Sequence, residues 1–324
     1  MILLWGLRHE APMAAVLHAL TRRGVETVMI DQRAYPTVVG SLTAHQHGAS
    51  GWISVAGCQR PIDEFSGYFL RPYPIPPRYR HGLTLHQVAA IDQMMLIVAE
   101  AAPAHIAVVN RPSAMASNDS KPAQLAQLED LGFLVPDTIV TNDRQVAEDF
   151  WARHGTVVYK STSGIRSIAN ILTSAHRNRL DRLATCPTQF QEFIPGIDYR
   201  VHVVGDEVFA TQIISTATDY RYAATQGAQR TMAAAQLPDH IVDQCRYATR
   251  ELRLLLAGID LRRTPDGDWY CFEVNTAPAF SWFQDHTGQP IADAVAALLQ
   301  HGAHTGTTVQ HDGKVRQTMT ESVS

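Results

Sequence analysis

Two short apolar segments carry oxygen-bearing side chains in a pattern that constrains the fold. Residues 272–276 read as a strand, and side chains two apart share one face of a strand, so Glu273 and Asn275 point to the same side. Residues 258–261 form a second candidate strand that contains one acid, Asp260. Antiparallel pairing of the two strands would set Asp260 beside Glu273 and Asn275. Oxygen ligands of this kind suit Mg²⁺ with substrate phosphates, so the pattern predicts a nucleotide-bound metal and ATP chemistry.

Composition excludes several classes of protein. The 324 residues are 45% apolar and 18% charged, which is ordinary for globular domains with real cores. A net charge of −4 gives no basic surface for nucleic acid or an anionic membrane, so neither partner is expected. The four cysteines are far apart, which favours reduced thiols and a cytoplasmic protein. No apolar run approaches the ~20 residues of a membrane span.

The N-terminal region alternates strands and helices. Residues 2–6 and 25–30 are expected strands on either side of a helix over 11–23, an order that implies a parallel sheet. The first turn lacks a Gly-x-Gly-x-x-Gly, so we expect no dinucleotide site there. Residues 67–70 form another expected strand before a proline-rich loop, and residues 83–102 have helical spacing.

The rest of the chain also mixes both element types. Further expected elements are strands over 106–109, 156–160 and 189–194, a hairpin of 198–204 and 207–215, and helices over 144–153, 237–257 and 290–300. Gly205-Asp206 is a turn pair between β-rich runs, which is the basis of the hairpin. The chain is therefore expected to be an α/β (α+β) protein.

Two lysines are candidates for phosphate binding. Lys160 ends an apolar strand and faces a loop of small hydroxyl and glycine residues, an arrangement that suits phosphate. Lys121 stands at a helix start, where the helix dipole disfavours a cation and a partner anion would compensate. The competing interpretations are a lysine snorkelling from a strand end and a solvated surface lysine.

A connecting strand and the residues after it could hold a nucleoside. The backbone of residues 191–194 offers hydrogen-bonding groups to the edge of a base, and Phe193 and Ile194 offer an apolar wall. Asp198 could accept hydrogen bonds from ribose hydroxyls. Arg200 and Arg221 could balance phosphate charge. The alternative is a hinge strand with a solvated Glu192 and surface arginines in salt bridges.

The order of these signals along the chain resembles the ATP-grasp superfamily, and within it the RimK-like carboxylate–amine ligase branch. The resemblance covers residues 110 to 300 or so and is carried by Lys121, Lys160, Gln191-Glu192-Phe193-Ile194, Asp198-Tyr199-Arg200, Arg221, Gly258-Ile259-Asp260 and Glu273-Val274-Asn275. Residues 132–138 resemble the linker between helix and strand in that family. Residues 69–72 and 140–143 resemble the microviridin-type ligases, which mature ribosomal peptides into macrocycles.

The resemblance implies a role for each site residue. It implies that Lys121 and Lys160 contact the phosphates of ATP. It also implies that Glu192, Phe193 and Ile194 line the adenine site and that Asp198 contacts the ribose. Asp260, Glu273 and Asn275 would hold one or two Mg²⁺ ions. Arg221, with Lys160, would neutralise charge during phosphoryl transfer, which makes these two the catalytic candidates. The implied cofactors are ATP and Mg²⁺.

The resemblance also implies a division of the chain. The expected units are an N-terminal Rossmann-like pre-ATP-grasp domain (1–110), a central ATP-grasp subdomain (111–188), a C-terminal ATP-grasp subdomain (189–304) and a disordered tail (305–324). A homodimer is the oligomeric state that the family suggests.

The implied reaction joins a carboxylate to an amine or hydroxyl through an acyl phosphate, with release of ADP and phosphate. The expected substrate is a peptide or an amino acid. Two alternatives stay open at this point. One is a macrocyclase that forms side-chain ester or amide links in a ribosomal peptide, and the other is an ATP-binding regulatory protein without ligase activity.

Overall fold

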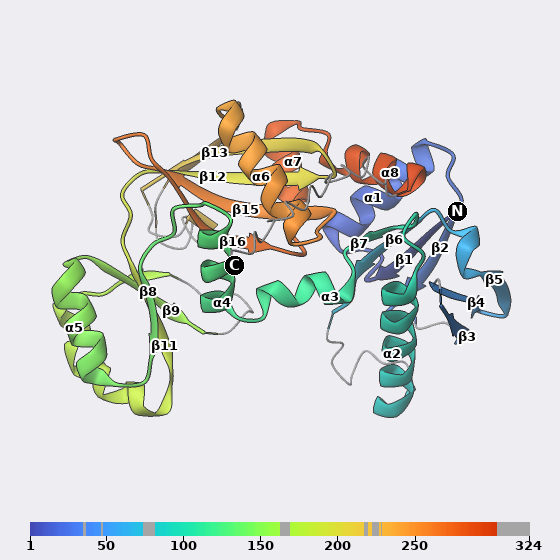
Figure 1. Ribbon diagram of the computed structural model, residues 1–324, viewed down its shortest axis with the longest axis horizontal. Coiled ribbons are helices and arrows are strands. Elements are labelled where there is room, and N and C mark those ends of the chain that lie inside the picture. The colour runs from blue at the N-terminus through green and yellow to red at the C-terminus, as the bar shows by residue number, and fades with distance from the viewer. Residues whose placement is uncertain are drawn as a thin grey trace, which may run out of the picture.

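The computed structural model describes residues 1–34, 37–46, 48–73, 82–162, 169–216, 220–221, 227 and 229–302. Within these ranges the strands form four sheets, and helices are interspersed among them along the chain (Figure 1). Most of the predicted loop after Lys160, most of the proline-rich loop and the predicted tail lie outside the described residues.

The N-terminal sheet is parallel, as predicted. Its strands β1 (Ile2–Gly6), β2 (Thr27–Asp31), β6 (Gly67–Arg71) and β7 (Ala107–Val109) lie in the order β2-β1-β6-β7. Every residue of β1 and β6 is buried, which is typical of parallel strands covered on both faces. The carboxyl ends of these strands meet at one edge, which faces the C-terminal part of the chain (Figure 1).

Helices cover both faces of this sheet. Ile2 and Leu4 pack with helix α1 (Ala11–Arg22) and with the last described helix, α8 (Ile291–His301). Leu3 and Trp5 point to the other face, where they pack with helix α2 (Leu85–Ala101). The chain therefore returns from its C-terminal half to complete the N-terminal core.

A small antiparallel sheet between β2 and β6 was not predicted. It consists of β3 (Val38–His45), β4 (Gly48–Val55) and β5 (Cys58–Pro61), followed by the 3₁₀ helix η1 (Ile62–Glu64). Half of the residues in its first two strands are glycine, serine, threonine or histidine, so the alternation of apolar residues that identifies a strand is weak.

A short helical segment leads from β7 into the middle of the chain. It comprises α3 (Pro112–Met115), η3 (Ala116–Asn118) and α4 (Lys121–Asp130). Lys121 is thus the first residue of α4, as predicted, and Pro122 follows it in the first turn, where a missing N–H has no cost.

The central sheet is antiparallel and carries helices on one side. Its strands lie in the order β10-β9-β11-β8, with bounds β8 (Thr138–Thr141), β9 (Val157–Ser161), β10 (Asn170–Ile171) and β11 (Thr188–Glu192). Helix α5 (Arg144–His154) and the 3₁₀ segment η4 (Ser174–Thr185) pack on it through a small core around Phe150 and Phe190.

The C-terminal sheet is antiparallel and has five strands in the order β14-β13-β12-β15-β16 within the described part of the chain. Their bounds are β12 (Ile197–Val204), β13 (Glu207–Ser215), β14 (Arg230–Ala235), β15 (Leu256–Arg263) and β16 (Trp269–Asn275). Strands β12 and β13 are the predicted hairpin. Helix α6 (Asp239–Glu251) covers the sheet, and α7 (Ser281–Thr287) follows β16.

The predicted helix over 237–257 is wrong at its C-terminal end. Helix α6 ends at Glu251, Arg253 adopts a positive φ of 54°, and Leu256 already belongs to β15. The leucine-rich run favours a helix locally, but pairing of β15 with strands on both sides prevails.

The structure also describes the state of the cysteines and the character of the helices. All four cysteines lie in the described ranges and are free thiols, with Cys58 and Cys186 exposed and Cys245 and Cys271 buried. Among the helices that the structure describes, none combines the length and apolar character needed to cross a membrane.

Candidate active site

The two acids predicted to bind metal lie side by side. Strands β15 and β16 pair antiparallel with Asp260 opposite Glu273, as the sequence analysis expected, and Gly258 lies opposite Asn275. Lys121 Nζ lies 3.0 Å from Glu273 Oε2, and Arg200 Nη1 lies 2.6 Å from Asp260 Oδ1. The second oxygen of each carboxylate has no hydrogen-bond partner among the described residues, which leaves both available to a ligand.

The ionisation of these groups is set by burial and by their neighbours. Burial opposes the charge on Glu273, but the ammonium groups of Lys121 and Lys160 outweigh it and lower the pKa of this carboxyl. Burial likewise opposes the charge on Arg200, and the adjacent Asp260 more than offsets this and raises its pKa. The Glu273 carboxylate and the Arg200 guanidinium are therefore both charged at neutral pH.

Lys160 differs from Lys121 and Arg200 in that no described acid forms an ion pair with it. It lies on β9 opposite Gln189, and within the described residues its ammonium makes no hydrogen bond or ion pair. Burial, with nearby Lys121 and Arg221, lowers the pKa of Lys160 from 10.5 to about 8, against the opposing effect of Glu273. A buried cation whose pKa is lowered in this way suits an anionic ligand, which would stabilise its charged form.

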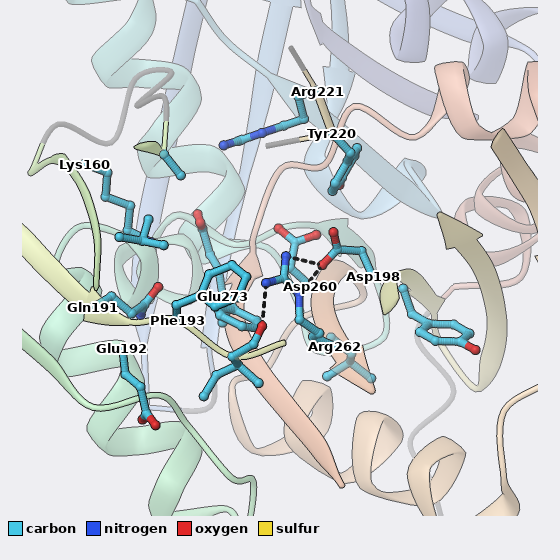
Figure 2. Close-up of a pocket in the computed structure, with 16 residues that line it drawn as sticks. Lys160, Gln191, Glu192, Phe193, Asp198, Tyr220, Arg221, Asp260, Arg262 and Glu273 are labelled. Atoms are coloured by element: carbon cyan, nitrogen blue, oxygen red, sulfur yellow. Dashed lines mark hydrogen bonds and ion pairs between the residues drawn. The ribbon is translucent and has the colours of Figure 1, made fainter. Parts of the chain in front are cut away.

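Two cavities meet at the paired acids. Figure 2 shows the smaller one, which lies between the central and C-terminal sheets and is lined by Lys160, Phe193, Ile194, Asp198 and Arg262, among others. The larger cavity, about 870 Å³, extends toward the N-terminal sheet and is lined by Arg71, Tyr73, Lys121, Asn275 and Trp282, among others. Tyr220, Arg221, Asp260 and Glu273 line both cavities.

Arg262 organises one wall of the smaller cavity. It contacts Asp198 Oδ1 at 2.7 Å and donates to the carbonyl of Ile194 at 2.8 Å. Its guanidinium also lies 6.0 Å from the centre of the Phe193 ring. The sequence analysis missed Arg262, although it shares a strand face with Asp260 and could have been found from that spacing.

Glu192 is the predicted site residue that the structure turns elsewhere. Its side chain points away from the Lys160 and Arg221 side (Figure 2). Its carboxylate accepts a hydrogen bond from the backbone N–H of Asp137 at 3.3 Å and lies near His154. Glu192 therefore borders the smaller cavity mainly as part of the connecting strand.

Comparisons with known proteins decide the family. The RimK-like ATP-grasp domain family matches residues 119–299, which is more than half of the chain. The chain belongs to the RimK-like ATP-grasp family. The predicted family, the ATP-grasp fold and an ATP-dependent ligase are thereby confirmed. No curated protein matches the sequence.

Solved ATP-grasp structures share this fold over nearly the whole chain. A Chryseobacterium gregarium RiPP-associated ATP-grasp ligase, in complex with ADP and a leader and core peptide, aligns with a TM-score of 0.76 and 23% identity over 92% of this chain and 96% of its own. The ATP-grasp ligase PsnB, complexed with minimal precursor, Mg and ADP, aligns with a TM-score of 0.74 and 28% identity over 92% of this chain and 96% of its own. The macrocyclase MdnC from Microcystis aeruginosa MRC, bound with precursor peptide MdnA, aligns with a TM-score of 0.74 and 21% identity over 93% of this chain and 99% of its own.

The ATP-grasp site of this chain fits a hard cation together with phosphate. Asp260 and Glu273 each present a carboxylate oxygen with no partner among the described residues, and Asn275 adds an amide oxygen on the same strand face. Lys160 and Arg221 lie beside them on the cavity wall. This donor set is the one that Mg²⁺ prefers, so the residues present fit the ion.

The loop after β16 is fastened to the N-terminal sheet. The amide oxygen of Asn275 accepts from the N–H of Ala277 at 3.0 Å. Asn110, at the end of β7, donates to the carbonyl of Thr276 at 2.6 Å, and Arg71, at the end of β6, donates to that of Pro278 at 3.1 Å. The sequence analysis did not foresee these contacts, because they join segments that only the fold brings together.

Proposed function

We propose that this ATP-grasp ligase activates a carboxylate of a peptide as an acyl phosphate and then joins it to an amine or a hydroxyl. The observation that carries the proposal is the junction of the two cavities at Tyr220, Arg221, Asp260 and Glu273. ATP in the smaller cavity would present its terminal phosphate at this junction. A substrate in the larger cavity would meet the phosphate there.

The side chains suit the two ends of ATP. Phe193 and Ile194 would pack against adenine, and Asp198, oriented by Arg262, would accept from the ribose. Lys160 and Lys121 would bind phosphate oxygens, and Lys121 would then share its ammonium between phosphate and Glu273. Asp260, Glu273 and Asn275 would hold Mg²⁺, which neutralises phosphate charge when bound.

The reaction needs positioning more than a protein nucleophile. A carboxylate oxygen of the substrate attacks the γ-phosphorus, the bond to the bridging oxygen breaks, and ADP leaves. The acceptor nitrogen or oxygen then attacks the carbonyl carbon, loses its proton, and releases phosphate. Arg221 and Lys160 would stabilise the charge on the transferred phosphoryl group, since both lie on the cavity wall beside Glu273.

A peptide is the substrate class that the comparisons favour. PsnB and MdnC were solved with their precursor peptides, and PsnB is 28% identical to this chain over nearly its full length. The larger cavity has room for a peptide side chain and its neighbours, and its wall mixes the aromatic Trp282 and Phe283 with charged groups near the acids.

The test is a ligation assay with purified protein, ATP, Mg²⁺ and precursor-type peptides rich in Thr, Ser, Lys, Asp and Glu. We expect ADP and phosphate, with loss of one water from the peptide for each bond formed, as measured by mass spectrometry. AMP and pyrophosphate would overturn the acyl-phosphate route. Tight Mg²⁺–ATP binding without ADP formation across all peptides would favour a regulatory protein.

A macrocyclase is the second candidate, favoured by the likeness to MdnC. Tandem mass spectrometry of the product distinguishes the two. Links between side chains of one peptide indicate cyclisation, and a product larger than the peptide by an added amine indicates intermolecular ligation. Hydroxylamine cleavage separates ester links from amide links.

A further inference from the structure

Gln124 occupies the outer edge of the strand that carries two proposed metal ligands. Strand β16 is the last strand of its sheet in the described chain, so one side of its backbone has no neighbouring strand. Unpaired backbone groups in a buried position are costly, and something must satisfy them. Near the middle of β16, the backbone N–H of Cys271 donates to the carbonyl of Leu134 at 2.8 Å.

At the site end of β16 the partner is a single side chain. Gln124 Nε2 donates to the carbonyl of Val274 at 2.8 Å, and Gln124 Oε1 accepts from the N–H of Val274 at 3.0 Å. Gln124 is 2% exposed and Val274 is fully buried. The amide therefore imitates a neighbouring strand at the one residue between Glu273 and Asn275.

Gln124 also fixes the position of a lysine. It lies three residues after Lys121 on α4, and residues three apart share a helix face. The same helix face thus carries the amide that hydrogen-bonds Val274 and the ammonium that contacts Glu273 at 3.0 Å. A shift of α4 along β16 would break both contacts together.

We propose that Gln124 is a positioning residue for the metal end of the site. It holds the backbone between Glu273 and Asn275 and sets the register of Lys121 against Glu273. This inference rests on the proposed function for the identity of the metal ligands. Residues that orient metal ligands typically change metal affinity by about 10- to 100-fold when they are replaced.

The experiment compares Gln124→Met with Gln127→Met in the full chain. Methionine keeps the length and helix preference of glutamine and removes both hydrogen bonds. Gln127 is exposed on the same helix, so its variant controls for the substitution itself. Calorimetry measures ADP affinity with Mg²⁺ and, separately, with EDTA, and hydrogen exchange reports on β16.

We expect Gln124→Met to lower the affinity for Mg²⁺–ADP by about 10-fold or more, and the affinity for ADP in EDTA by a smaller factor. We also expect the amides of β16 to exchange faster than in the wild type. Gln127→Met should match the wild type. Unchanged Mg²⁺–ADP affinity, or an equal loss with and without Mg²⁺, would overturn the proposal.

A second variant guards against a folding defect. Gln124→Glu keeps an acceptor for the Val274 N–H but places a carboxylate oxygen against the Val274 carbonyl, so we expect it to lose Mg²⁺–ADP affinity as well. If neither Gln124 variant unfolds cooperatively, the residue is merely structural and the proposal fails. None of these measurements needs a peptide, so a failed ligation assay would count against the proposed function alone.

Discussion

The two lysines of the site should respond in opposite directions to the same substitution. Lys160 is buried without an ion pair among the described residues, and its pKa falls from 10.5 to about 8 mainly because of burial. Since a tenfold change in a proton equilibrium is worth about 1.4 kcal/mol, this corresponds to about 3 kcal/mol of lost stability near neutral pH. Lys160→Met removes the charge, and we expect it to stabilise the ligand-free protein by about 2–3 kcal/mol, because the side chain keeps some contact with water.

Lys121→Met should instead destabilise the ligand-free protein. Lys121 neutralises Glu273 at 3.0 Å in a pair whose side chains are only 14% and 19% exposed. Its removal leaves a carboxylate without its nearest cation, and we expect a loss of about 2 kcal/mol, less than for a fully buried pair. Both variants should lose Mg²⁺–ADP affinity. Urea unfolding without nucleotide at pH 7 measures the stabilities, and calorimetry measures binding.

The pH dependence gives the sign of the lysine effect independently. Below pH 8 the ammonium of Lys160 is charged in the folded and unfolded states, so the full cost applies. Between pH 8 and 10.5 the folded protein releases this proton while the unfolded chain keeps it, and stability rises with pH. Lys160→Met should lack this rise. A Lys160→Met protein less stable than the wild type at pH 7 would refute the reasoning.

Three further predictions concern other parts of the site. Glu273→Gln should lower ADP formation by about 100-fold or more while circular dichroism shows an intact fold, and normal turnover would remove the metal assignment. Arg221→Met should lower kcat by about 100-fold with Mg²⁺–ADP affinity within about threefold of wild type, and equal losses in both would contradict a role confined to phosphoryl transfer. Asn110→Ala should cost about 3 kcal/mol in urea unfolding, because it leaves backbone groups of Leu255, Leu256 and Thr276 unsatisfied. The exposed Asn142→Ala should cost close to nothing.

The sequence predicted the parts of this protein that depend on local pattern. The βαβ order indicated a parallel sheet, and the structure has one. The Gly205-Asp206 turn indicated a hairpin, which is β12 and β13. The period-two spacing of Glu273 and Asn275 placed both on one strand face, and the opposite position of Asp260 followed from the next acidic strand upstream.

Where local pattern and tertiary context disagreed, context prevailed. The run after α6 has a helical composition, yet residues from Leu256 onward pair with β12 and β16 as a strand. The small sheet of β3 to β5 escaped prediction because few of its residues are buried, so it lacks strong apolar alternation. Glu192 lines the smaller cavity, and side-chain packing decides that its carboxylate lies toward Asp137 and His154.

The acids on the strands and the two lysines were predicted from short local patterns, and the family was predicted from the order of those patterns along the chain. The three-dimensional structure was needed to show that Lys160 has no ion pair with any described residue, that Arg262 holds Asp198, and that Gln124 occupies the edge of β16. The physical reason is that partners and burial depend on residues far apart in the chain. Gln124 and Val274 are 150 positions apart, and no local pattern marks either as the partner of the other.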